Sequence, residues 1–126
     1  MQIDIQARGF HLTEALRAHV TRRLGFALHG RDQAVRRVRV RLSDINGPRG
    51  GEDKCCHVQI TLDRLSDVIV KDVQGDLYAA IDRAADRVGG ALARRLKRQR
   101  IRRRLFGSAF DKHHAAMSEG AAPESV

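Results

Sequence analysis

Residues 76–104 read DLYAAIDRAADRVGGALARRLKRQRIRRR, and this stretch predicts one long amphipathic helix that begins near Gly75 and Asp76. Its apolar side chains recur at helical spacing and form one stripe, made of Tyr78, Ile81, Ala85, Val88, Leu92 and Leu96. Because an α-helix turns by about 100° per residue, four arginines fall within about 60° of one another, away from that stripe. They are Arg83, Arg87, Arg94 and Arg98, with Lys97 and Arg102 close by. The helix therefore combines a core face with a row of cations.

Alternation of apolar and polar residues predicts four strands before this helix, at residues 2–7, 35–42, 54–63 and 67–73. In the second strand, Val38, Val40 and Leu42 take one face and Arg37, Arg39 and Arg41 take the other. The third strand is expected to turn Cys56, Val58, Ile60 and Leu62 inward, and Cys55, His57, Gln59 and Thr61 outward. The facing of the fourth strand stays open, because apolar residues occur on both of its sides. Residues 46–51 read as a loop.

A shorter helix is predicted between the first two strands. Thr13 is a suitable N-cap, and Glu14 lies in the first turn, where the helix dipole favours an acid. Apolar residues follow at helical spacing (Leu16, Val20, Leu24 and Ala27), and Gly30 ends the helix. The resulting order, β-α-β-β-β-α, predicts an α+β two-layer sandwich of a four-stranded sheet with two helices on one face.

Composition limits the range of possible functions. A chain of 126 residues is long enough for one domain, expected at residues 1–104, and residues 105–126 lack periodicity and are expected to form a flexible tail. The net charge is +9, and eight basic residues without an acid lie between positions 94 and 104. Such a charge favours a polyanionic partner. The N-terminal residues lack a signal sequence and no apolar run is long enough to span a membrane, so we expect a cytoplasmic protein without a membrane partner.

The basic residues are the candidate RNA-binding site, because the planar guanidinium group of arginine can bind two phosphate oxygens at once. Arg22 and Arg23 would join the row if the two helices pack side by side. The predicted contacts are Arg22, Arg23, Arg83, Arg87, Arg94, Arg95, Lys97, Arg98 and Arg102. Arg37, Arg39 and Arg41 form a possible second row, unless acids on neighbouring strands neutralise them. Aromatic residues are few and scattered, which favours recognition of the RNA backbone over base reading.

No arrangement of residues predicts catalysis. The six histidines show no metal-ligand spacing with acids or cysteines, and no nucleotide-binding glycine motif occurs. The adjacent Cys55 and Cys56 are expected on opposite faces of a strand and therefore as free thiols. We expect no enzymatic activity, no cofactor, no metal and no small-molecule substrate.

Four segments in this order resemble the family of ribosome hibernation-promoting factors and ribosome-associated inhibitors, also called sigma-54 modulation proteins, in its short form. They are MQIDIQARGF (1–10), LTEALRAHV (12–20), VRVRLSD (38–44) and DLYAAIDRAADRV (76–88), and the resemblance covers about residues 1–100. It implies the β-α-β-β-β-α fold that the periodicity predicts independently. It also implies a non-enzymatic regulator that binds rRNA of the small ribosomal subunit in the mRNA and tRNA channel. Such proteins idle ribosomes under stress or in stationary phase, and basic residues on the two helices usually make the rRNA contacts.

The chain also departs from that family. Long members carry a second, dimerising domain for which this chain is too short, and the segment DINGPRGGEDKCC (44–56) is longer and richer in glycine than expected. Two alternative functions remain: a general nucleic-acid-binding module, and a protein-interaction module that modulates a transcription factor. Competition by other polyanions would identify the first, and a complex that survives nuclease and salt would identify the second.

Overall fold

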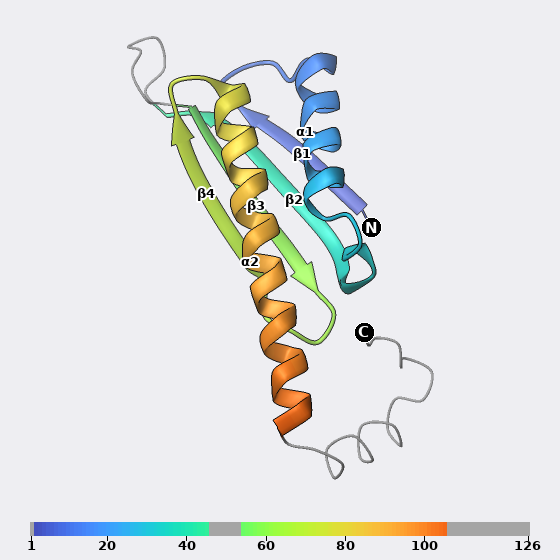
Figure 1. Cartoon of the computed structure of the whole chain (residues 1–126). Coiled ribbons are helices and arrows are strands. Elements are labelled where there is room, and N and C mark those ends of the chain that lie inside the picture. The colour runs from blue at the N-terminus through green and yellow to red at the C-terminus, as the bar shows by residue number, and fades with distance from the viewer. Residues whose placement is uncertain (1, 46–53, 106–126) are drawn as a thin grey trace. The chain divides into compact units, whose positions relative to one another are not determined.

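The computed structural model describes residues 2–45 and 54–105 and confirms the predicted order of elements (Figure 1). The elements are β1 (Gln2–Arg8), α1 (Glu14–Ala27), a short 3-10 helix η1 (Asp32–Ala34), β2 (Val35–Asp44), β3 (Lys54–Leu62), β4 (Val68–Gln74) and α2 (Leu77–Leu105). The predicted loop at 46–51 and the predicted tail after Phe106 lie outside the described residues. In the described part of the chain, no helix is both long and apolar enough to cross a membrane.

The chain divides into two compact units, Met1–Ala91 and Leu92–Val126, so that the boundary falls within α2. The first unit contains the sheet, α1 and the N-terminal half of α2. Of the second unit, the structure describes residues 92–105, which are helical throughout. The expected division into a domain at 1–104 and a tail at 105–126 stays a prediction.

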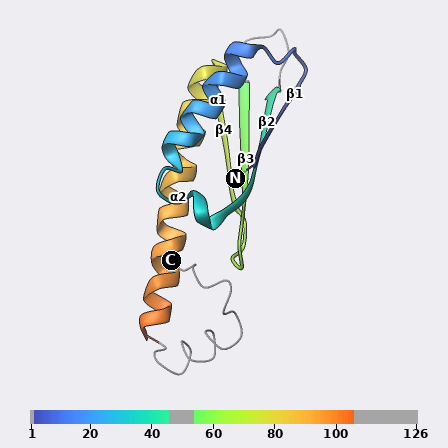
Figure 2. The same ribbon diagram turned by 90° about the vertical axis from the view of Figure 1, so that its right-hand side faces the viewer.

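The sheet has the order β1-β2-β3-β4. β1 is parallel to β2, and the other two pairs are antiparallel. A parallel pair needs a crossover connection, and α1 supplies it. In the first unit, α1 and the first half of α2 lie on the same face of the sheet (Figure 2), as predicted. None of the described helices lies on the opposite face (Figure 2).

Local capping agrees with the sequence. The Thr13 hydroxyl accepts a hydrogen bond of 3.1 Å from the Leu16 amide and caps α1. Asp76 does the same for α2, accepting a 3.1 Å hydrogen bond from the Ala79 amide. Gly30 follows α1 with a φ of +82°, a left-handed conformation that glycine adopts without strain.

The core forms where the helices meet the sheet, and most predicted inward residues are buried. They include Leu16, Val20 and Leu24 of α1, Val38, Val40 and Leu42 of β2, and Ile81, Ala85 and Val88 of α2. Ala80 and Ala84 are also fully buried. α1 and α2 approach closely at Gly89, where an added Cβ would lie 3.1 Å from the main-chain oxygen of Ala27. A side chain at this crossing would require the main chain of Ala27 to move by a few tenths of an ångström.

Two expectations about facing change in the structure, which also decides the facing of β4 that the sequence left open. Tyr78 is 39% exposed and does not belong to the core, because it lies in the first turn of α2 with its ring edge-on to His19, at a centroid distance of 4.9 Å. Cys55 is buried, although its position in the β3 register puts it on the outer side, and nothing in the alternation explains this. β4 turns Val68, Val70 and Asp72 inward, and Ile69 outward.

Candidate nucleic-acid interface

The basic residues predicted on α2 fall into two groups with different surroundings. Arg83 and Arg87 belong to the first unit, where acidic residues are close. Arg94, Arg95, Lys97, Arg98 and Arg102 belong to the described part of the second unit.

Arg83 and Arg87 are tied to a buried acid on β4. Arg87 donates from Nη1 to the Asp72 carboxylate at 3.0 Å and to the main-chain oxygen of Lys71 at 2.8 Å. Arg83 Nε lies 3.7 Å from the same carboxylate, and the Gln74 amide donates to its other oxygen at 2.7 Å. Both arginines remain more than half exposed, so each still presents donors to solvent. Asp72 therefore orients two of the predicted RNA-binding side chains and neutralises part of their charge.

Burial by itself would raise the pKa of Asp72. The hydrogen bonds from Gln74 and Arg87, together with the charges of Arg83 and Arg87, outweigh burial and lower the pKa below its ordinary value of 3.8. Asp72 is consequently ionised at neutral pH. A carboxylate that is only 6% exposed would be costly without these partners.

Arg23 links α1 to α2. Its Nε lies 3.0 Å from Asp82 and its Nη2 lies 3.0 Å from Asp86. His19 also contacts Asp82, with 2.7 Å between Nε2 and Oδ1. Asp82 and Asp86 therefore both pair with a cation from the neighbouring helix. Sequence spacing along α2 alone does not reveal a partner on α1.

Arg22 is the predicted α1 residue that remains exposed beside this linkage. Its guanidinium makes one weak contact, 3.4 Å from His19 Nδ1. The two helices do lie side by side in the first unit, which was the condition for Arg22 and Arg23 to join the row (Figure 1). Arg22 can therefore join the row as an exposed cation, whereas Arg23 is largely occupied by its ion pairs with Asp82 and Asp86.

The described part of the second unit is a helical segment of high positive charge. Residues 92–105 contain eight basic residues and no acid. Arg94, Lys97, Arg98 and Arg102 are exposed and make no ion pair with a described residue, whereas Arg95 is half-buried and has a partner. Like charges this close repel one another unless an anion lies nearby. This segment carries the densest run of positive charge among the residues that the structure describes.

The open face of the sheet carries the second predicted row. Arg37 is half-buried and pairs with Asp4 on β1 at 3.5 Å, so a neighbouring acid does neutralise this one. Arg39 and Arg41 are exposed, and the strand register places Arg41 in line with His57 and Lys71. Lys71 was not predicted as part of this row, because the facing of β4 could not be decided from its apolar pattern.

The cysteines do not form a reactive site. Both are free, as predicted, and both are buried. Burial raises the pKa of the Cys56 thiol to about 12, with further contributions from Cys55 and Asp72. At neutral pH the thiol stays protonated and is a poor nucleophile.

The fold defines the class of this domain, a four-stranded mixed sheet covered on one face by two helices. The family model described as sigma 54 modulation protein / S30EA ribosomal protein matches residues 3–104. The chain therefore belongs to the sigma 54 modulation protein / S30EA ribosomal protein family, which makes it a ribosome-associated protein.

Solved structures with similar folds agree with this assignment, and 24 chains match. The N-terminal domain of Protein Y from Thermus thermophilus is 29% identical, with a TM-score of 0.61 over 75% of this chain and 98% of that one. A ribosomal subunit interface protein from Coxiella burnetii has a TM-score of 0.63 at 15% identity, over 75% of this chain and 96% of that one, and supports the fold alone. No curated protein matches the chain.

Proposed function

We propose that the protein is a non-enzymatic translation regulator that binds rRNA of the small ribosomal subunit in the mRNA and tRNA channel and idles cytoplasmic ribosomes under stress or in stationary phase. The ribosome as partner is supported by family membership, because the matching family model is described as sigma 54 modulation protein / S30EA ribosomal protein. One observation from this chain carries the proposal: residues 92–105 present eight cations without an acid.

The physical basis is counterion release. Each phosphate neutralised by an arginine or lysine releases condensed cations into solution, which drives association and makes the affinity fall with added salt. Guanidinium groups suit this role because each can bind two phosphate oxygens at once. The exposed Arg94, Arg98 and Arg102 would make such contacts, with Arg22, Arg83, Arg87 and Lys97 contributing further charge.

Charge reversal tests this proposal. Arg94, Arg98 and Arg102 are changed together to Glu, and binding to purified small subunits is measured by co-sedimentation at low salt. A control variant carries Glu at Arg8, Arg17 and Arg36, which are exposed residues outside α2, so its net charge is the same. We expect the first variant to lose binding and the control to retain most of it. Equal binding by the two variants would show that only net charge matters, and would contradict a site on α2.

A general nucleic-acid-binding module is the second candidate, and the lack of acids among the cations of residues 92–105 favours it, because such a surface attracts any polyanion. Competition separates the two functions. Duplex DNA and total RNA should displace a general module from subunits at the same phosphate concentration as free subunits do. A ribosome-specific regulator should resist both competitors.

A further inference from the structure

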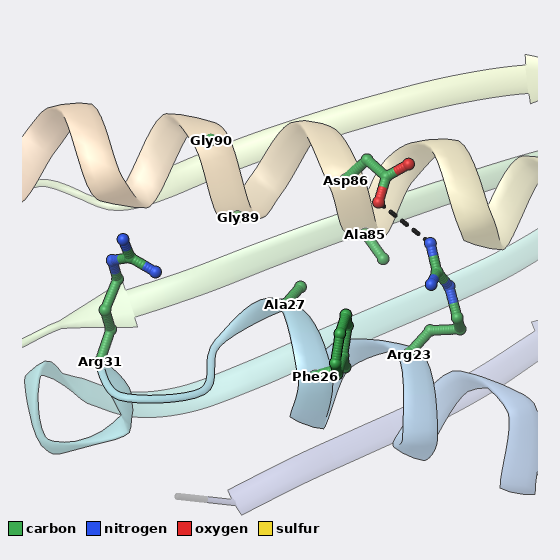
Figure 3. A pocket seen from close by; sticks show the side chains of 8 residues that line it. All are labelled: Arg23, Phe26, Ala27, Arg31, Ala85, Asp86, Gly89 and Gly90. Atoms are coloured by element: carbon green, nitrogen blue, oxygen red, sulfur yellow. Dashed lines mark hydrogen bonds and ion pairs between the residues drawn. The ribbon is translucent and has the colours of Figure 1, made fainter.

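An open hollow lies between α1 and α2 in the first unit, with a volume of about 230 Å³ (Figure 3). Its lining residues are Arg23, Phe26, Ala27, Arg31, Ala85, Asp86, Gly89 and Gly90. Half of these residues are alanine or glycine, so no large side chain fills the space between the helices. Pockets for drug-sized ligands measure about 300 to 1,000 Å³, so this hollow suits something smaller, such as one planar ring.

Phe26 is an exposed aromatic side chain in this hollow. It is 77% exposed, which makes it the most exposed large hydrophobic residue among those described. Figure 3 shows its ring pointing toward α2, between the side chains of Arg23 and Arg31. The apolar stripe of α1 does not include it, and no ring contact of Phe26 with a described residue is present. A phenyl ring left this exposed gains nothing from the core and is available to a partner.

The charges around Phe26 suit a phosphate-bearing partner. Arg31 is exposed, and its side chain makes no hydrogen bond or ion pair with a described residue. Arg23 donates to Asp86 at 3.0 Å, so one carboxylate offsets one of the two guanidinium groups. The hollow therefore keeps one uncompensated positive charge next to an aromatic face.

We propose that this hollow receives one unpaired base of the RNA, stacked on Phe26, while Arg31 binds a phosphate next to that base. The inference rests on the proposed RNA-binding function and adds a base contact to the contacts with the RNA backbone. An aromatic side chain combined with a cation is the usual means of holding a single-stranded base, and stacking tolerates any base because each has a π-face. A structured protein segment is the less favoured occupant, because the space admits one ring and the unpaired charge is positive.

The absence of tryptophan from the chain allows a direct optical test. Phe26→Trp places a single indole in the hollow, and a base stacked on it quenches its fluorescence. The probes are a short single-stranded oligoadenylate and a matched oligonucleotide with the same backbone but abasic sites. Binding of both is followed independently by anisotropy of a label on the oligonucleotide. We expect quenching by the oligoadenylate and little quenching by the abasic strand, although both bind.

The second measurement is the affinity of Phe26 and Arg31 variants for purified small ribosomal subunits. Phe26→Ala should weaken binding about tenfold, within the range for loss of one stacked base, whereas Phe26→Tyr should retain most of it. The slope of log affinity against log salt should not change in Phe26→Ala, because stacking releases no counterions. Arg31→Gln should reduce that slope by about one. Ile69→Ala removes another exposed apolar side chain outside the hollow and serves as the matched control.

The outcomes separate the two proposals. The stacking site would be overturned if small subunits bound the wild type and Phe26→Ala equally and the oligoadenylate did not quench Phe26→Trp. The proposed function would not be affected by that result. Loss of affinity in Phe26→Ala without quenching by the oligoadenylate would assign the hollow to a protein contact and also overturn a base site. If the wild-type protein did not bind small subunits, the proposed function would be overturned. Quenching of Phe26→Trp by the oligoadenylate would still show whether a base stacks in the hollow.

Discussion

Arg87 on α2 reaches across to β4 and holds the Asp72 carboxylate at 3.0 Å. The contact joins a side chain predicted to bind RNA to an acid that is 6% exposed. Arg87 is therefore a structural residue as well as a surface cation. This double role distinguishes it from Arg94, which has no ion pair with a described residue.

Asp72→Asn should destabilise the fold by about 1 to 3 kcal/mol at neutral pH. The substitution removes the buried negative charge that pairs with Arg83 and Arg87. Urea unfolding measures this difference. The folded-state pKa of Asp72 lies below its ordinary value of 3.8, so the carboxylate contributes its full stability above that pH and loses it as the pH falls through the folded-state pKa. The difference between wild type and Asp72→Asn should therefore shrink below pH 3.8. A constant difference down to the lowest pH would argue against an ionised Asp72.

Arg87→Gln and Arg94→Gln should separate structural from binding arginines. Arg94→Gln should leave the urea midpoint unchanged and lower the salt slope of binding by about one, as expected for one lost phosphate contact. Arg87→Gln should lower both the midpoint and the affinity, because it leaves Asp72 with fewer partners. Equal unfolding midpoints for the two variants would contradict the structural role of Arg87.

Gly89→Ala should destabilise the first unit, by about 1 to 3 kcal/mol, because the new Cβ would lie 3.1 Å from the Ala27 main-chain oxygen. Gly25→Ala is the matched control on α1, where nothing lies within 4 Å of the added Cβ. That change should stabilise the helix by about 1 kcal/mol. Thermal unfolding compares the two, and destabilisation of similar size in both variants would contradict a specific contact at Gly89.

Neither cysteine should react with a thiol reagent in the native protein at neutral pH. Both are buried and thus shielded from the reagent, and the pKa of Cys56 is raised to about 12, so almost none of the Cys56 thiol is ionised. Labelling with a chromogenic disulfide reagent should proceed only after unfolding in urea. Rapid labelling of the folded chain would show that the strand opens locally, since only an exposed thiolate reacts.

The order of elements and most of the core could be predicted from the sequence, because alternation and helical spacing are local patterns. The Val38, Val40 and Leu42 face of β2 and the Thr13 cap are two such cases, and the structure confirms both. Family membership agrees with the resemblance carried by the four quoted segments.

The pairing of charges could not be predicted, because it depends on contacts between elements far apart in the chain. Arg23 meets Asp82 and Asp86 across 59 or more residues, and Asp72 lies inward on a strand whose facing was open. Spacing along α2 places cations on one side of a helix, but it does not say which of them are already paired. The hollow beside Phe26 likewise arises only when Ala27 and Gly89 bring two helices together.

The helical segment 92–105 should respond to ionic strength in two opposite directions. Eight neighbouring like charges oppose the helix that carries them, so screening by dissolved ions should strengthen this part of α2 in the free protein. The same ions weaken its attraction to polyphosphate. In concentrated salt, this segment of the free protein would therefore form a more stable helix and have a lower affinity for polyanions. In dilute salt, a bound polyanion would itself act as the counterion that stabilises the helix.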